Sequence, residues 1–164
     1  MERARRFMNR LIMSVLIFQG ISLVLIIGVS VFFRYVVGAA LSWPGEVAGI
    51  IFVWYTLLGV VVLVGSESHI AFDLIGKYAP AFIDKFVKLL SQCIVLLYGV
   101  FMVVYGWKYL QLFPDETSPA AGINLSYLKV AIPVTGVLVV AYVSLNIVEV
   151  FKRSSRLAAE KEGA

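Results

Sequence analysis

The stretch LIMSVLIFQGISLVLIIGVSVFF, residues 11–33, decides the fold because its 23 residues carry no charge. Three further uncharged apolar runs follow, at 47–66, 89–107 and 130–148. Roughly 20 apolar helical residues cross a bilayer core about 30 Å thick. Lipid offers no partner for bare backbone groups, so each run is expected to be a helix. The prediction is an all-α integral membrane protein with four transmembrane helices, at about 11–33, 45–66, 86–110 and 130–150.

Composition indicates one membrane domain covering residues 1–164. Hydrophobic residues make up 61% of the chain, and the mean hydropathy is +0.94. The net charge of +4 comes from basic residues beside the apolar runs, so membrane lipids are the expected partners and nucleic acid is not. The first run exceeds the roughly 7–15 apolar residues of a signal peptide, so we interpret it as a retained span.

Basic residues are distributed unevenly between the two sides of the predicted spans. Eleven lie in the N-terminal tail, the 67–88 connection and the C-terminal tail. Only Arg34, Lys108 and Lys129 lie on the opposite side. The positive-inside rule therefore predicts that both termini face the cytoplasm.

The 67–88 connection between the second and third spans is predicted to be amphipathic. Phe72, Ile75 and Phe82 recur at roughly helical spacing among lysines, a pattern typical of a helix in the headgroup layer. A helix running from Pro80 into the third span, as far as Leu112, would be about 50 Å long. Such a helix exceeds the bilayer, so it should tilt or project into the cytoplasm.

Charges at the span ends are the candidates for specific contacts. The short 34–46 connection predicts a tight antiparallel hairpin, in which Arg34 and Glu46 either pair or reach into a partner protein. Pro44 suits the first turn of a helix, and Glu46 suits its N-terminus. Gly45 and Gly49 have a spacing that permits close helix approach.

Two further features lie near other span ends. His69 and Asp73 are four residues apart after the second run and could share a hydrogen bond. Pro133 lies near the start of the fourth run, where we expect it to kink the helix.

No catalytic, cofactor-binding or metal-binding residue is predicted. The chain has one histidine and one cysteine, so a metal-ligand cluster is not expected. The uncharged spans disfavour a transport pathway within this chain, because such pathways usually need ionisable residues. Two alternatives remain open besides a subunit of a larger assembly. A small four-span exporter would need an acid within the membrane, and a membrane anchor of a redox complex would need haem or quinone ligands.

An ordered set of short motifs extends over about residues 10–150. The set comprises Arg34-Tyr35, Ser42-Trp43-Pro44-Gly45-Glu46, Trp54, Gly59, His69-Ile70-Ala71-Phe72-Asp73, Ser118-Pro119-Ala120-Ala121-Gly122-Ile123 and Ala131-Ile132-Pro133-Val134-Thr135-Gly136. In this order the motifs resemble the small permease subunit of tripartite ATP-independent periplasmic (TRAP) transporters. One difference is that Gly45 precedes Glu46, where the family often has two adjacent acids.

The resemblance implies a scaffold role in the bacterial inner membrane. Such subunits join a large permease subunit that carries the sodium and substrate sites. A periplasmic substrate-binding protein delivers an organic anion such as a dicarboxylate or sialic acid. This chain would anchor and stabilise the large permease subunit without a cofactor, although a bound phospholipid would suit the subunit interface.

The resemblance and the charges at the span ends together predict the site residues. The expected interface or structural positions are Arg34, Ser42, Trp43, Glu46, Trp54, Gly59, His69, Asp73, Pro133 and Gly136. The expected contacts with the binding protein are Trp43, Asp115, Glu116, Ser118 and Pro119.

Overall fold

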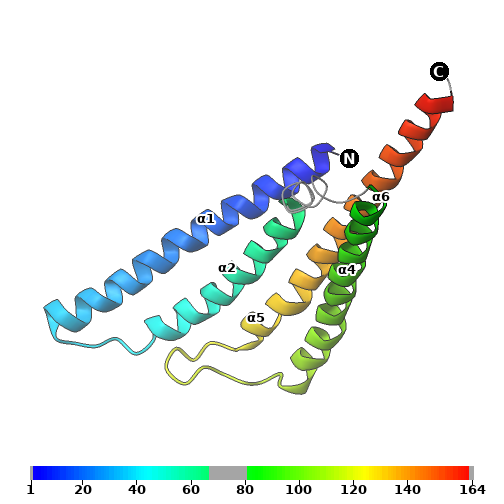
Figure 1. Ribbon diagram of the computed structural model, residues 1–164. Coiled ribbons are helices and arrows are strands. Elements are labelled where there is room, and N and C mark those ends of the chain that lie inside the picture. The colour runs from blue at the N-terminus through cyan, green and yellow to red at the C-terminus, as the bar shows by residue number, and fades with distance from the viewer. Residues whose placement is uncertain (1, 67–80, 163–164) are drawn as a thin grey trace.

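The computed structural model describes residues 2–66 and 81–162, and this part of the chain is helical with short connections (Figure 1). The elements are α1 (Glu2–Phe32), the π-helical η1 (Phe33–Val37), α2 (Pro44–Ser66), α4 (Ala81–Leu112), α5 (Ser126–Lys129) and α6 (Ala131–Glu162). Four segments are long and apolar enough to cross a membrane: Arg6–Val37, Pro44–Gly65, Leu89–Leu112 and Ser126–Ile147. The all-α prediction with four membrane-spanning helices is thus confirmed.

Local sequence sets the helix ends as expected. α2 begins at Pro44, which has no N–H to leave unpaired, and the Trp43 carbonyl accepts the N–H groups of Glu46 and Val47, both at 3.2 Å. α4 covers 32 residues and ends at Leu112, in agreement with the predicted long third helix. Residues 67–80 of the predicted amphipathic connection, with His69, Asp73 and Pro80, lie outside the described residues, and residues 81–88 form the start of α4.

The core lies where α1, α2 and α6 meet, in the half of the bundle that holds the N-terminus. Its buried members are Ile12, Leu16, Leu58, Val61, Val139, Tyr142 and Val143. The Tyr142 hydroxyl reaches across from α6 and donates a hydrogen bond to Asn9 Oδ1 on α1 at 2.5 Å.

The helices α1 and α2 pack against each other as an antiparallel hairpin. The two helices run antiparallel, joined by the 38–43 loop (Figure 1). Gly45 and Gly49, expected to permit close approach, have no neighbouring atom within 4 Å of an added Cβ. The contacts of α1 with α2 therefore do not involve these two glycines; they include Gly20 beside Tyr55, and Ile12 and Leu16 in the core.

The closest helix crossing joins α4 and α6 instead. A Cβ added to Gly136 of α6 would lie 2.8 Å from the Gly99 carbonyl oxygen and 2.9 Å from Met102 Cβ. A Cβ added to Gly106 of α4 would lie 2.9 Å from Pro133 Cδ. Pro133 is the third residue of α6, and the span Ser126–Ile147 is interrupted just before it, between the end of α5 at Lys129 and the start of α6 at Ala131.

Candidate functional site

Glu46 joins the two halves of the chain at the end of the bundle that holds the 38–43 and 113–125 loops, which we call the loop end. Its carboxylate accepts a hydrogen bond from the Ser118 hydroxyl. It also accepts the N–H of Ala120, 3.0 Å from both carboxylate oxygens, and the N–H of Ala121 at 2.7 Å. Such bonds are strengthened by the negative charge. The first turn of α2 therefore fixes the loop between α4 and α5.

The 113–125 loop is folded so that two backbone N–H groups point at this carboxylate. Ser118 and Ile123 are joined by a backbone hydrogen bond of 2.8 Å, and the Gly122 N–H donates to the Ser118 carbonyl at 3.0 Å. Gly122 has φ +65°, a left-handed conformation that glycine adopts without steric cost. The turn thus presents the N–H groups of Ala120 and Ala121 side by side.

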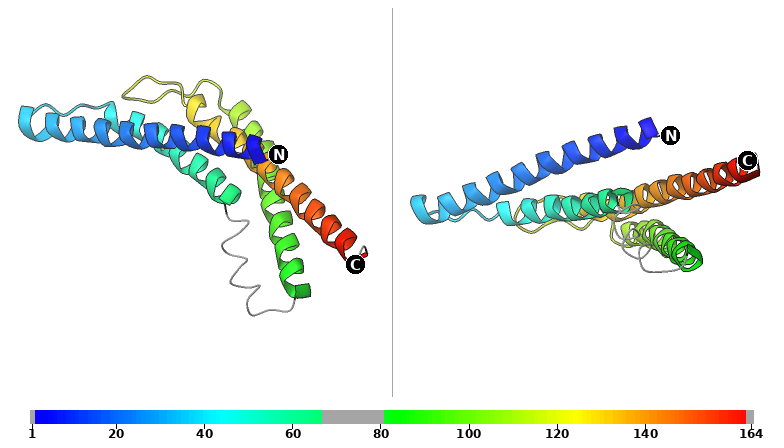
Figure 2. Two further views of the ribbon diagram at one scale, coloured as in Figure 1. Left: turned by 90° about the horizontal axis from the view of Figure 1, so that it is seen from above. Right: turned by 45° about the horizontal axis from the view of Figure 1, so that its top comes forward.

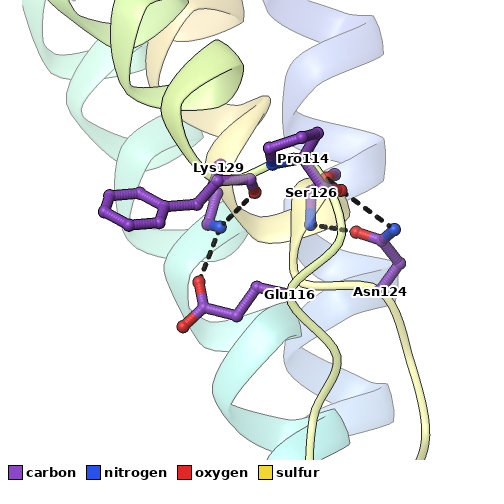
Figure 3. A network of polar contacts seen from close by, with 6 residues as sticks. Pro114, Glu116, Asn124, Ser126 and Lys129 are labelled. Carbon is purple, nitrogen blue, oxygen red and sulfur yellow. Dashed lines mark hydrogen bonds and ion pairs between the residues drawn. The ribbon is translucent and has the colours of Figure 1, made fainter.

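Lys129, at the end of α5, forms a second polar contact at the loop end (Figure 3). Its ammonium donates to the Phe113 carbonyl at 2.8 Å and to Glu116 Oε2 at 2.7 Å, and the side chain is only 2% exposed. It also lies 5.5 Å from the Tyr109 ring centroid. Burial of a charge is costly unless the charge is paired and hydrogen-bonded, and Lys129 has both kinds of partner.

Further hydrogen bonds join α5 to the 113–125 loop and to α2. Ser126 and Asn124 both donate to the Pro114 carbonyl, at 3.1 and 3.3 Å, and the Ser126 N–H donates to Asn124 Oδ1 at 2.7 Å (Figure 3). Trp54 Nε1 on α2 donates to the Tyr127 carbonyl at 2.8 Å. α2 is therefore tied to the second half of the chain at both Glu46 and Trp54.

The predicted site residues of the first loop separate in space. Arg34 is exposed on η1, while the Glu46 carboxylate is turned toward Ser118. The expected ion pair between Arg34 and Glu46 within the chain is wrong, because the 113–125 loop supplies the partners of Glu46. Ser42 is exposed and Trp43 is 41% exposed, so both are accessible.

The residues expected to contact a binding protein have different surroundings. Asp115 and Pro119 are exposed, and Glu116 is 53% exposed although it pairs with Lys129. Ser118 is 4% exposed and its hydroxyl binds Glu46, so its side chain holds the loop together.

The remaining predicted positions lie between helices. Gly59 lines a groove between α1 and α2 together with Leu16 and Tyr55. Pro133 and Gly136 lie in the crossing of α4 and α6. The predictions omitted the partners of this crossing on α4, Gly99 and Gly106, whose spacing of seven residues on one helix was the available signal.

Lys129 was also missed as a structural residue. The sequence analysis counted it only among the few basic residues on one side of the spans. Its place at the start of an apolar run, with Glu116 in the preceding connection, was a signal for a buried pair.

The loop end joins two helical hairpins, and four helices can cross a membrane, so the chain is a multi-pass membrane protein. Residues 23–153 match the family described as "Tripartite ATP-independent periplasmic transporters, DctQ component". The chain belongs to this family. It is thus a component of a binding-protein-dependent transporter and not an enzyme, and the exporter and redox-anchor alternatives are not favoured.

Three similar proteins agree with this assignment. A protein of Haemophilus influenzae named as a TRAP transporter small permease is 25% identical over 122 residues, which cover 74% of each chain. The sialic acid TRAP transporter permease protein SiaT of the same species is 28% identical over 108 residues, covering 64% of this chain and 17% of SiaT. The C4-dicarboxylate TRAP transporter small permease protein DctQ of Vibrio cholerae is 26% identical over 87 residues, covering 53% of this chain and 38% of that protein.

Proposed function

We propose that the chain is the small membrane subunit of a sodium-coupled secondary transporter that imports organic anions. In this role it anchors and stabilises the large permease subunit in the bacterial inner membrane, and a periplasmic binding protein delivers the substrate. The names of two similar proteins, which refer to sialic acid and to C4-dicarboxylates, support an organic anion as the substrate.

The observation that carries the scaffold role is the binding of the Glu46 carboxylate by Ser118, Ala120 and Ala121. A stationary subunit must resist the movements of the part that carries substrate. The Glu46 contacts join the first hairpin to the second where no covalent connection does so. Together with the close crossing of α4 and α6, they favour a rigid framework.

The match to SiaT supports the choice of partner. The segment of SiaT that is similar to this chain is a small part of a longer permease protein. In that protein, the matched segment and the remaining sequence are joined in one polypeptide. We therefore expect this chain to associate with a separate large permease subunit in the same membrane.

The loop end is proposed to face the periplasm, with both termini in the cytoplasm. In that orientation the exposed Trp43, Asp115 and Pro119 are accessible to the binding protein. Arg34 and Ser42, exposed at the same end, remain candidates for contact with the large permease subunit.

Reconstituted uptake tests this function directly. Proteoliposomes containing the large permease subunit and the binding protein, with and without this chain, would be supplied with labelled dicarboxylate or sialic acid. Uptake should require both this chain and an inward sodium gradient. Equal uptake without the chain would contradict the scaffold role, and equal uptake without sodium would contradict the proposed coupling.

A further inference from the structure

One face of α4 exposes a line of aromatic side chains along its apolar segment. Tyr98, Phe101, Tyr105 and Tyr109 are 55%, 54%, 53% and 42% exposed. Their spacing of three and four residues places them on one side of the helix. The rings of Phe101 and Tyr105 are in contact, with centroids 4.2 Å apart. We call these four residues the aromatic face.

The aromatic face borders a groove that continues onto the neighbouring helices. Besides the four aromatic residues, the groove is lined by Leu57 of α2, Met102 and Gly106 of α4, and Ile132 of α6. Met102 is 7% exposed and Gly106 is buried, whereas the aromatic side chains project. The surface is thus a ridge of rings beside a shallow groove between α4 and its neighbours, a shape that can receive another helix.

The depth of Tyr98 indicates what covers this face. Tyr98 is the tenth residue of the 24-residue apolar segment Leu89–Leu112. At 1.5 Å per residue it lies about 14 Å from one end of that segment and about 21 Å from the other. The described residues give its hydroxyl no hydrogen bond, and lipid chains cannot supply one. Tyrosine is usually enriched at the membrane interface rather than at this depth.

The exposed face of α1 provides the contrast. Phe18 and Val24 are both 72% exposed there, and their side chains carry no polar atom. Ser14 and Ser22 on the same helix donate to carbonyls of their own helix, those of Arg10 at 2.9 Å and of Phe18 at 2.8 Å. These surfaces of α1 can face lipid without losing a hydrogen bond, whereas Tyr98 cannot.

We propose that the aromatic face and its groove bind a transmembrane helix of the large permease subunit. This helix carries a polar group that hydrogen-bonds the Tyr98 hydroxyl. The proposal rests on the proposed function, because it needs a large subunit in the same membrane. It adds the choice of face: α4 faces the partner, and the exposed side of α1 faces lipid.

Site-specific photo-crosslinking in membranes that contain the whole transporter tests the proposal. The photoreactive residue p-benzoylphenylalanine would replace Tyr98, Phe101 or Tyr105, each in a separate variant. The matched control replaces Phe18, an equally large and more exposed aromatic residue on α1. Adducts with the large subunit are expected from the three α4 positions and not from Phe18.

A second pair of variants measures how much the Tyr98 hydroxyl contributes to binding of the large subunit. Tyr98→Phe removes only the oxygen atom, and Tyr127→Phe removes the same atom from a residue that is 67% exposed at the loop end. Hydrogen bonds between membrane helices are typically modest, so Tyr98→Phe should weaken retention of the large subunit about threefold in detergent. Tyr127→Phe should leave retention unchanged.

The outcomes separate this inference from the function on which it rests. If the large subunit does not co-purify with the unmodified chain, the proposed function fails, and the inference fails with it. If it co-purifies but the adducts form from Phe18, or the α4 positions crosslink to a second copy of this chain, only the inference is overturned. Unchanged retention in Tyr98→Phe would overturn the predicted hydrogen bond.

Discussion

Two short motifs far apart in the sequence meet at one carboxylate. Glu46 and the donors to its carboxylate in the 113–125 loop are 72 to 75 residues apart. Glu46 stands at a helix N-terminus, where a negative charge is favoured, and its side chain then satisfies two backbone N–H groups of another loop. This contact explains the small residues of the motif Ser118-Pro119-Ala120-Ala121-Gly122. Their short side chains let the Glu46 carboxylate reach the backbone N–H groups.

Glu46→Gln keeps the size of the side chain and removes its charge. The amides of Ala120 and Ala121 should then exchange with deuterium faster than in the wild type, because they lose charge-assisted hydrogen bonds. Hydrogen exchange followed by mass spectrometry of the 113–125 peptide measures this effect.

The control for this variant is Asp115→Asn, which removes a charge from an exposed residue of the same loop. Its exchange profile should match that of the wild type. Equal protection of Ala120 and Ala121 in Glu46→Gln would mean that the carboxylate does not hold the loop.

Lys129 is the second residue that stabilises the loop end. Lys129→Met keeps a long side chain but leaves the Phe113 carbonyl and Glu116 without their shared donor. The variant loses two charge-assisted hydrogen bonds made by a buried side chain, so the free energy of unfolding should fall by about 1–3 kcal/mol. Denaturant titration of the chain in detergent, followed by tryptophan fluorescence, measures it.

Lys108→Met provides the comparison for Lys129. Lys108 is exposed, and its ammonium lies 5.5 Å from the Tyr105 ring centroid. Its removal should change the free energy of unfolding much less. A loss as large as that of Lys129→Met would show that burial of Lys129 has no special effect.

At the scale of helices, glycine residues act according to what faces them. Gly99, Gly106 and Gly136 let α4 and α6 approach until backbone and Cβ atoms touch. Gly45 and Gly49 have the familiar small-residue spacing but face open space within this chain. Without a hydrophobic driving force between helices in lipid, close packing at such positions is a main source of helix association.

Alanine at Gly136 should therefore lower the stability of the chain, whereas alanine at Gly49 should not. In Gly136→Ala the new methyl group would lie 2.8 Å from the Gly99 carbonyl oxygen, so the helices must separate. Overpacking of this kind costs about 1–3 kcal/mol. Gly49→Ala meets no atom within 4 Å and should be neutral or stabilising by up to about 1 kcal/mol, because alanine favours helix.

Thermal unfolding of the isolated chain in detergent compares the two variants. The unfolding temperature should fall for Gly136→Ala and stay level or rise for Gly49→Ala. A fall in both would indicate that helix flexibility, rather than the α4–α6 contact, determines the result.

At the scale of the whole molecule, α1 stands partly apart from the other helices. Its buried core residues are Ile12 and Leu16, and it lies at the edge of the bundle beside α2 (Figure 2). α6 lies between α2 and α4 and contacts both. The molecule therefore presents two unlike surfaces, the apolar side of α1 and the aromatic face of α4 with its tyrosine hydroxyls.

The orientation of the molecule in the membrane remains a prediction from charge. A green fluorescent protein fused after Ala164 should be fluorescent, because it folds in the cytoplasm, and alkaline phosphatase fused there should be inactive. The same reporters fused after Asp115 should give the reverse pattern. An active phosphatase at the C-terminus would mean that the positive-inside rule fails for this chain.

The sequence by itself determined the four spans and the start of α2 at Pro44. These features depend on local properties: the length of an apolar run, the missing N–H of a proline and the preference of an acid for a helix N-terminus. The long third helix follows from the same kind of information.

Only the tertiary structure decided which span ends meet. It turned Glu46 away from Arg34 toward Ser118, buried Lys129 beside Glu116, and placed the close crossing at Gly136 rather than at Gly49. Each of these contacts depends on how far the helices tilt and rotate against one another. Hydropathy places a helix across the membrane, but it does not set that rotation, because lipid accepts many apolar surfaces equally well.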